Sequence, residues 1–184
     1  MYGDKSYLLD EKRAGQAVNM ALPAIEAVMQ QLGRPNLHIV VLNPGLPRES
    51  VYDLTDAILY ERSLGDRSSW PHDYDVIARS KAEVALRTGM PAHLVQQRAP
   101  FLYTEGNTRH GGSVVFEGLV VACSGVPWYF DQMFSYWISA ASQALCIQAM
   151  EPILQSDTDF LGDNAFVGGN EIEPGTFHDE NKED

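Results

Sequence analysis

The stretch that decides the fold is Ser113–Ser124, which reads SVVFEGLVVACS. Two short apolar runs, Ser113–Glu117 and Leu119–Ser124, stand on either side of Gly118. Runs of this length that are rich in β-branched residues are typical of buried strands. Glycine supplies the backbone freedom that a tight turn requires. We therefore predict an antiparallel hairpin in this part of the chain.

An earlier pair of strands is expected upstream. Leu37–Leu42 (LHIVVL) has the composition of a buried strand, and the turn residues Asn43-Pro-Gly-Leu-Pro follow it. A second strand is predicted at Ala57–Arg62. The intervening segment Arg48–Asp56 is interpreted as an insertion at the end of the hairpin.

Three helices are predicted around these strands. The first begins after Asp10, whose carboxylate can cap a helix N-terminus, and Pro23 inside it predicts a kink. Its apolar residues recur every three or four positions: Ala14, Ala17, Val18, Ala21, Ile25, Val28 and Leu32. Gly33 and Pro35 end it.

The second predicted helix runs from a cap at Asp75 to Thr88, and Gly89 stops it. Pro91–Gln97 is expected as a short further helix, and the last long helix is expected to begin at Asp131. The order is helix, two strands, helix, two strands, helix. It predicts an α+β fold in which helices pack on an antiparallel sheet.

Composition favours one cytoplasmic domain. The 184 residues suffice for one core, and no apolar stretch is long enough to cross a bilayer. Met1–Asp10 lacks the pattern of a signal peptide. Cys123 and Cys146 are two isolated cysteines, which fits a reducing compartment.

The acidic charge is concentrated at the C-terminus. Residues 151–184 hold ten acidic residues and one lysine, a net charge of −9, out of −12 for the whole chain. We expect a domain over residues 1–150 and an acidic tail over 151–184. The tail is expected to be disordered beyond about residue 170, or else its phenylalanines dock on a neighbouring subunit. Without a basic face the chain is not expected to bind nucleic acid.

The loop Thr104–Gly112 is the predicted ligand site. Gly111 and Gly112 allow a backbone to approach a ligand closely, Arg109 can grip a carboxylate, and His110 can donate, accept or bind a metal. Alternatively, both glycines only shape the start of a strand. Lys81 could add a cation to the same pocket, or it could be a solvated helix residue.

A second polar segment, Trp70-Pro-His-Asp-Tyr-Asp, places His72, Asp73 and Asp75 close together. Imidazole and carboxylates can bind a divalent cation. The segment matches no fixed ligand spacing, so we interpret it as a structural loop and predict no metal site.

Four segments, taken in order, resemble the GlcG/HbpS-like family of small-ligand and haem-binding proteins. They are Tyr7–Ala14, the strand LHIVVLN, the helix Ala78–Pro91, and above all His110–Val126 with its Gly-Gly, strand, Gly turn, strand and Ser-Gly order. The resemblance covers roughly residues 7–149. The resemblance implies a profilin-like domain that assembles into dimers or larger rings. Members of the family are associated with haem binding or with small-acid metabolism. The insertion Arg48–Asp56 and the acidic tail depart from the family pattern.

Haem would need an axial ligand beside an apolar slot. The available imidazoles are those of His38, His72, His93, His110 and His178. His38 lies in a predicted strand and is interpreted as a core residue, and His110 is taken as the candidate axial ligand. The chain has no Cys-x-x-Cys-His, so covalent haem is excluded by sequence.

The leading functional hypothesis is a non-catalytic, oligomeric protein that binds a small organic acid or haem through the Gly-Gly loop and Lys81. The rival is a small cofactor-independent enzyme acting on a carbonyl or carboxylate substrate. In it His110 or Glu105 is the acid or base and Arg109 the anion clamp. A third reading is a structural oligomer with an acidic arm. At least a dimer is expected, because the last helix is rich in aromatic residues: Phe130, Phe134, Tyr136 and Trp137.

Overall fold

The protein is built on a four-stranded antiparallel sheet, seen in a computed structural model that describes residues 8–46 and 53–154. The strand order is β2-β1-β4-β3. The strands are β1 (Leu37–Leu42), β2 (Ile58–Leu64), β3 (Ser113–Phe116) and β4 (Leu119–Ser124). The predicted α+β fold is confirmed.

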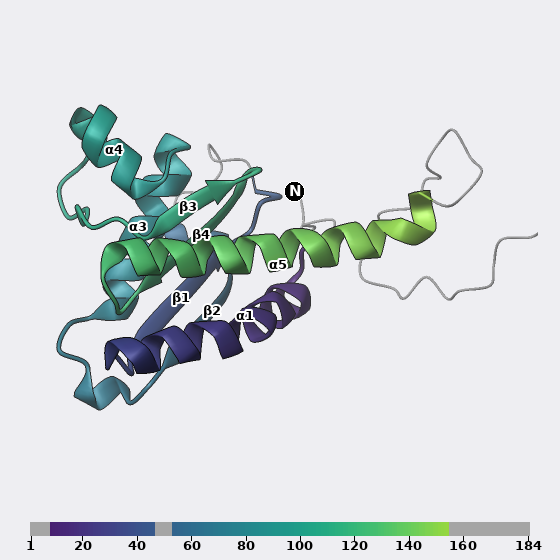
Figure 1. Ribbon diagram of the computed structural model, residues 1–184. Coiled ribbons are helices and arrows are strands. Elements are labelled where there is room, and N and C mark those ends of the chain that lie inside the picture. The colour runs from purple at the N-terminus through teal and green to yellow at the C-terminus, as the bar shows by residue number, and fades with distance from the viewer. Residues whose placement is uncertain (1–7, 47–52, 155–184) are drawn as a thin grey trace, which may run out of the picture.

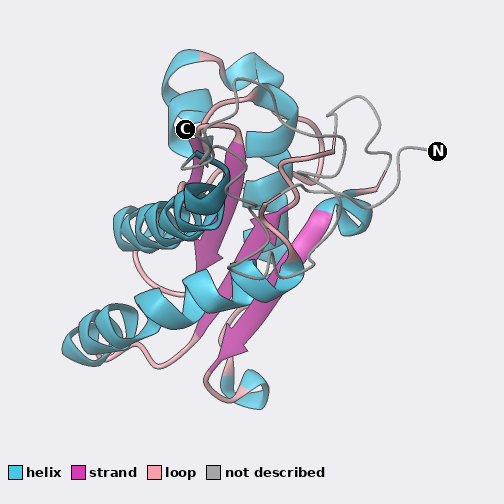
Figure 2. Cartoon of the chain, turned by 90° about the vertical axis from the view of Figure 1, so that its right-hand side faces the viewer, coloured by secondary structure: helices cyan, strands magenta, loops and turns pink. Residues whose placement is uncertain are grey.

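Helices cover both faces of this sheet (Figure 1). The long helices α1 (Glu11–Leu32) and α5 (Trp128–Leu154) lie side by side on one face, and α3 (Tyr74–Thr88) lies on the other, as the side view in Figure 2 also shows. The remaining elements are short: α2 (Leu54–Ala57), α4 (Ala92–Arg98), and the 3-10 turns η2 (Arg67–Ser69) and η3 (Pro100–Leu102).

The two layers explain why the central strands are apolar at nearly every position. In β1, Ile39 and Val41 pack with α1 and α5, whereas Val40 and Leu42 pack with the alanines of α3. Successive strand residues point to opposite faces. A strand that is covered on both sides therefore loses the alternation of polar and apolar residues that a half-exposed strand shows.

The hairpin β3–β4 has the predicted tight turn. Phe116 pairs with Leu119, and the two residues between them, Glu117 and Gly118, have φ of 50° and 88°. Two consecutive positive φ values match a type I′ turn, the geometry that fits the twist of a two-residue hairpin.

Helix α1 begins and ends as predicted. The Asp10 carboxylate accepts a hydrogen bond from Arg13 N at 2.7 Å. At the other end Gly33 is left-handed, with φ of 62°, and its N–H and that of Arg34 donate to the last-turn carbonyls. The helix continues through Pro23.

The predicted cap of α3 and the predicted start of α5 are both wrong. Helix α3 is preceded by Asp73, which makes no capping side-chain bond, and Asp75 lies inside the helix, where it forms an ion pair with Arg67. Helix α5 begins at Trp128, so Asp131 lies within its first turn and is buried. An aspartate near a helix start can cap the helix or find a charged partner, and spacing alone does not distinguish these roles.

Three other boundaries differ from the prediction. Strand β2 extends to Leu64 because it pairs with β1 as far as Leu37. The segment interpreted as an insertion contains α2, while residues 47–52 lie outside the described residues. Helix α5 continues to Leu154, past the predicted domain boundary at residue 150; the rest of the tail is not described. Within the described ranges, no helix is both long and apolar enough to span a bilayer.

The last helix contributes less apolar surface to solvent than its aromatic content suggested. Phe134 is fully buried, and Phe130 and Trp137 pack against the core. Of the four aromatic residues on which the predicted interface rested, only Tyr136 is exposed.

Candidate ligand-binding site

A buried ion pair joins the two helical layers at the end of β4. Lys81 Nζ from α3 donates to Asp131 Oδ2 from α5 at 2.8 Å and to the carbonyl of Cys123 at 2.8 Å. Both side chains are 2% exposed. Lys81 is therefore not the solvated residue that one reading of the sequence allowed. Removing two charges from water is costly, and the pair offsets that cost only through good geometry and additional hydrogen bonds.

Asp131 has such additional partners. Its Oδ1 accepts from Val126 N at 3.2 Å. Burial raises the pKa of this carboxyl to about 6, against the lowering effects of the Lys81 charge and the N–H donors. The effect of desolvation on the pKa of Asp131 is therefore larger than the opposing effect of the Lys81 charge.

Gly112 lies against this ion pair. A Cβ at this position would be 2.7 Å from Asp131 Cβ, 2.9 Å from Lys81 Nζ and 3.0 Å from the Cys123 carbonyl oxygen. Its φ of 121° is also one that L side chains rarely adopt. The second glycine of the pair is therefore required for the ammonium group to reach its partners.

Gly111 makes room for an aromatic stack instead. A Cβ there would be 2.6 Å from Trp128 Cε3 and 3.1 Å from His93 Cβ. The rings of Trp128 and His93 are stacked, with centroids 5.7 Å apart and planes inclined by 21°. Both glycines shape the approach to β3, and both do so in contact with groups at the candidate site.

A cavity of about 360 Å³ opens beside the ion pair. Its wall combines Lys81 and Asp131 with apolar residues of α3 and of the β4–α5 connection. Arg34, His72, His110 and Trp128 are exposed on it, and Tyr74 is buried. The lining residues are Arg34, His72, Tyr74, Ile77, Lys81, His110, Ser124, Gly125, Val126, Pro127, Trp128 and Asp131.

The structure brings together some of the residues singled out by sequence. Lys81 and His110 both line the cavity, and Gly111 and Gly112 contact its walls. Arg109 and Glu105 are exposed and do not belong to the lining. The preceding loop is fixed to α3, where Thr108 N donates to Ser80 Oγ at 2.9 Å.

Sequence reasoning missed Arg34, Trp128 and Asp131. Arg34 follows a helix C-cap and Trp128 precedes the predicted helix start, so neither position carried a signal. Asp131 did carry one: it is the only charged residue from Trp128 to Met150. A lone acid in an otherwise uncharged apolar helix indicates a buried partner, because an unpaired buried charge is strongly unfavourable.

The segment Trp70–Asp75 holds no metal-binding cluster. In the ranges that the structure describes, no three His, Cys, Asp or Glu side chains gather in a way that could hold an ion. Asp75 is engaged by Arg67, while His72 turns out to line the cavity.

His38 is the core histidine that the sequence predicted. Its Nδ1 lies 2.9 Å from Ser63 Oγ, and its Nε2 lies 3.4 Å from Glu61 Oε2. Burial lowers its pKa, although Glu61 acts in the opposite direction. Among the histidines of the described residues, only His72 and His110 line the cavity.

Several solved structures share this fold over most of their length. HbpS is 21% identical, with a TM-score of 0.52, and the match covers 76% of this chain and 93% of that one. The ORFY protein of Klebsiella pneumoniae, assigned to the family model DUF336, is 17% identical, with a TM-score of 0.51 and coverage of 78% and 97%. The Ybr137w protein is 16% identical, with a TM-score of 0.53 and coverage of 74% and 80%. No protein-family model and no curated protein matches the sequence.

The fold and the cavity together define a profilin-like α+β domain with a pocket of ligand size. The likeness to HbpS and ORFY confirms, at the level of the fold, the resemblance to the GlcG/HbpS-like family that the sequence motifs indicated.

Proposed function

We propose that this chain is a non-catalytic protein that binds a small organic acid in the cavity beside Lys81 and Asp131, auxiliary to a cytoplasmic catabolic or redox pathway. The observation that carries the proposal is the composition of the cavity wall. The wall carries the guanidinium of Arg34, the imidazoles of His72 and His110, and the indole ring of Trp128. The Lys81 ammonium group also belongs to the lining.

The donors at this wall suit a carboxylate. Lys81 has three N–H donors, of which Asp131 and the Cys123 carbonyl take two. Arg34 presents a guanidinium, which binds carboxylates in bidentate fashion. Trp128, Ile77 and Pro127 supply apolar surface for the body of the ligand. The volume of about 360 Å³ lies at the small end of ligand pockets, which favours a compact acid.

Haem is the second candidate. The family resemblance implies it, and His72 or His110 could supply an axial imidazole beside the apolar wall. Haem is larger than the cavity can accommodate unless the cavity opens. We therefore favour a small organic acid over haem as the ligand.

The enzyme alternative has less support. It required His110, Glu105 and Arg109 to act at one place, and only His110 belongs to the cavity lining. A general acid or base must reach the group from which it takes a proton.

Titration of the protein with benzoate, glycolate and hemin separates the two ligand candidates. We expect the acids to quench the fluorescence of Trp128, and Trp128→Phe to remove that response. A Soret band shift with hemin that is lost in His72→Ala or His110→Ala, without any response to the acids, would instead favour haem. No response to any of the three would contradict the proposal.

We also propose that the chain assembles through α5 into at least a dimer. One stripe of this helix is exposed, apolar and uncharged. It consists of Tyr129, Tyr136, Ala140, Ala144 and Ile147. Monomeric proteins rarely leave a long continuous apolar stripe in contact with water.

A further inference from the structure

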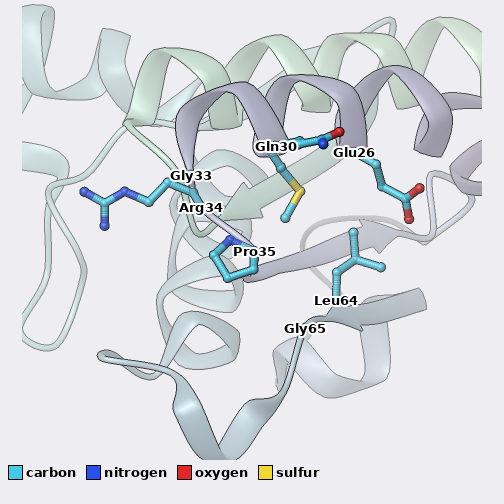
Figure 3. A pocket seen from close by; sticks show the side chains of 8 residues that line it. Glu26, Gln30, Gly33, Arg34, Pro35, Leu64 and Gly65 are labelled. Carbon is cyan, nitrogen blue, oxygen red and sulfur yellow. The ribbon is translucent and has the colours of Figure 1, made fainter.

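A second cavity lies at the opposite end of α1 from its N-cap. Arg34 lines both cavities, but Lys81 and Asp131 line only the first. The second cavity has a volume of about 540 Å³. The C-terminal half of α1, the turn into β1 and the end of β2 enclose it, and Figure 3 shows these walls. The proposed function makes no use of this cavity.

Two charged residues, Glu26 and Arg34, line this cavity. Glu26 lies on the wall opposite Leu64, whereas the Arg34 guanidinium points away from both, so the charge beside the apolar wall is negative (Figure 3). In the part of the chain that the structure describes, Glu26 makes no salt bridge. Gln30 adds an amide oxygen that can accept a further hydrogen bond.

The end of α1 adds to this negative potential. The carbonyl end of a helix carries a partial negative charge, which a basic residue in the last turn commonly offsets. Helix α1 has no basic residue in its last turn. Two of its last four carbonyls, those of Met29 and Gln30, accept the backbone N–H groups of Arg34 and Gly33.

The remaining wall is apolar. Met29, Pro35 and Leu64 line the cavity between the polar groups, and Met29 is almost completely buried. Methionine adapts its shape to the group that it contacts. The cavity thus combines an apolar wall with the Glu26 carboxylate and the negative end of a helix.

We propose that this second cavity binds an organic cation, an amine or guanidinium that bears a short apolar chain. The cationic group donates to the Glu26 carboxylate near the end of α1, and the chain lies against Met29, Pro35 and Leu64. Its charge is opposite to that of the ligand proposed for the cavity beside Lys81, so the two sites take different molecules.

Calorimetric titration with hexylammonium chloride tests the site, with hexanoate as a probe of equal length and opposite charge. Glu26→Gln removes the carboxylate at an exposed position, so folding is preserved. Glu11→Gln makes the same change of charge at the other end of α1 and is the matched control. We expect hexylammonium to bind wild type and Glu11→Gln equally, and Glu26→Gln about tenfold more weakly, since a charge-assisted hydrogen bond is lost.

Binding should also weaken as salt rises, and Trp128→Phe should leave it unchanged, because Trp128 belongs to the other cavity. The proposal is overturned if hexylammonium does not bind at millimolar concentration, if hexanoate binds equally well, or if Glu26→Gln retains wild-type affinity. It is likewise overturned if Trp128→Phe abolishes the binding. None of these outcomes bears on whether benzoate or glycolate binds beside Lys81.

Discussion

Lys81 and Asp131 are the residues that tie the architecture to the site. They come from helices on opposite faces of the sheet, and their contact closes the gap between the two layers at the end of β4. A buried ion pair is a weak source of stability, because desolvation offsets most of the attraction. The pair also lies on the wall of the cavity, where the proposed ligand would meet it.

The raised pKa of Asp131 predicts how stability depends on pH. The carboxyl has a pKa of about 6 in the folded protein against an ordinary value of 3.8. Between these values the folded state binds a proton that the unfolded state releases. The free energy of unfolding contributed by Asp131 must then fall as the pH rises from about 4 to 6, by a total on the order of 2–3 kcal/mol, and level off above about 7.

Urea denaturation of the wild type and of Asp131→Asn at matched pH values isolates this contribution, because all other carboxyl groups titrate in both proteins. The unfolding free energy of the wild type should fall relative to that of Asp131→Asn between pH 4 and pH 6. A difference that stays constant, or that moves in favour of the wild type as the pH rises, would show that burial does not dominate at Asp131.

The sequence predicted some of the individual residues of the site but not all of them. Lys81 and His110 were predicted for one pocket, and both line it. Arg109 was predicted as the anion clamp because it stands beside the glycines in the chain, and Arg34 was not considered. Which arginine faces the cavity depends on how the end of α1 meets the β4–α5 connection, a contact between segments about 90 residues apart that no local pattern records.

At the scale of elements, the approach to β3 shows how a glycine can be constrained in two ways. Gly112 and Gly118 both have positive φ, but a Cβ at Gly112 would crowd three groups, whereas a Cβ at Gly118, in the hairpin turn, would meet no atom within 4 Å. A substitution at Gly118 therefore introduces backbone strain alone, whereas one at Gly112 introduces backbone strain and steric crowding.

Gly118→Ala should therefore cost about 1 kcal/mol through backbone strain alone. Gly112→Ala should cost more, about 2–4 kcal/mol, because the new methyl group also displaces Lys81 or Asp131. Chemical denaturation of the two variants measures both values. Equal losses would mean that the ion pair shifts freely and that Gly112 is needed only for its backbone conformation.

The elements themselves were largely predictable, for physical reasons. The hairpin was found because its turn chemistry is local, and α1 because its cap and its apolar period agree. The start of α5 was missed because Trp128-Tyr-Phe has no capping residue before it, and Asp131 offered a plausible but incorrect first residue. Residue type alone does not report that a carboxylate is buried.

At the scale of the whole molecule, the exposed stripe on α5 predicts self-association. Tyr136 and Ile147 are 40% and 55% exposed. We expect light scattering to give at least twice the mass of the 20.4 kDa chain at micromolar concentration. Ile147→Glu should shift the protein towards the monomer, because it places a charge within an apolar contact.

Met20→Glu is the matched control, since Met20 is 59% exposed but lies on α1, outside the stripe. It should leave the mass unchanged. A wild-type protein with the 20.4 kDa mass of one chain, or equal dissociation by both variants, would contradict assembly through α5.

The central claim is that the cavity beside Lys81 and Asp131 binds a small organic acid, and a pair of arginine variants tests it most directly. Calorimetry with benzoate should show that Arg34→Ala weakens binding by roughly ten- to a hundredfold, as expected for the loss of a charge-assisted hydrogen bond of about 1.5–3 kcal/mol. Arg109→Ala removes the same charge from an exposed position outside the lining and should bind benzoate like the wild type. If Arg109→Ala loses affinity while Arg34→Ala does not, the acid binds at the loop before the glycines, and the site described above is wrong.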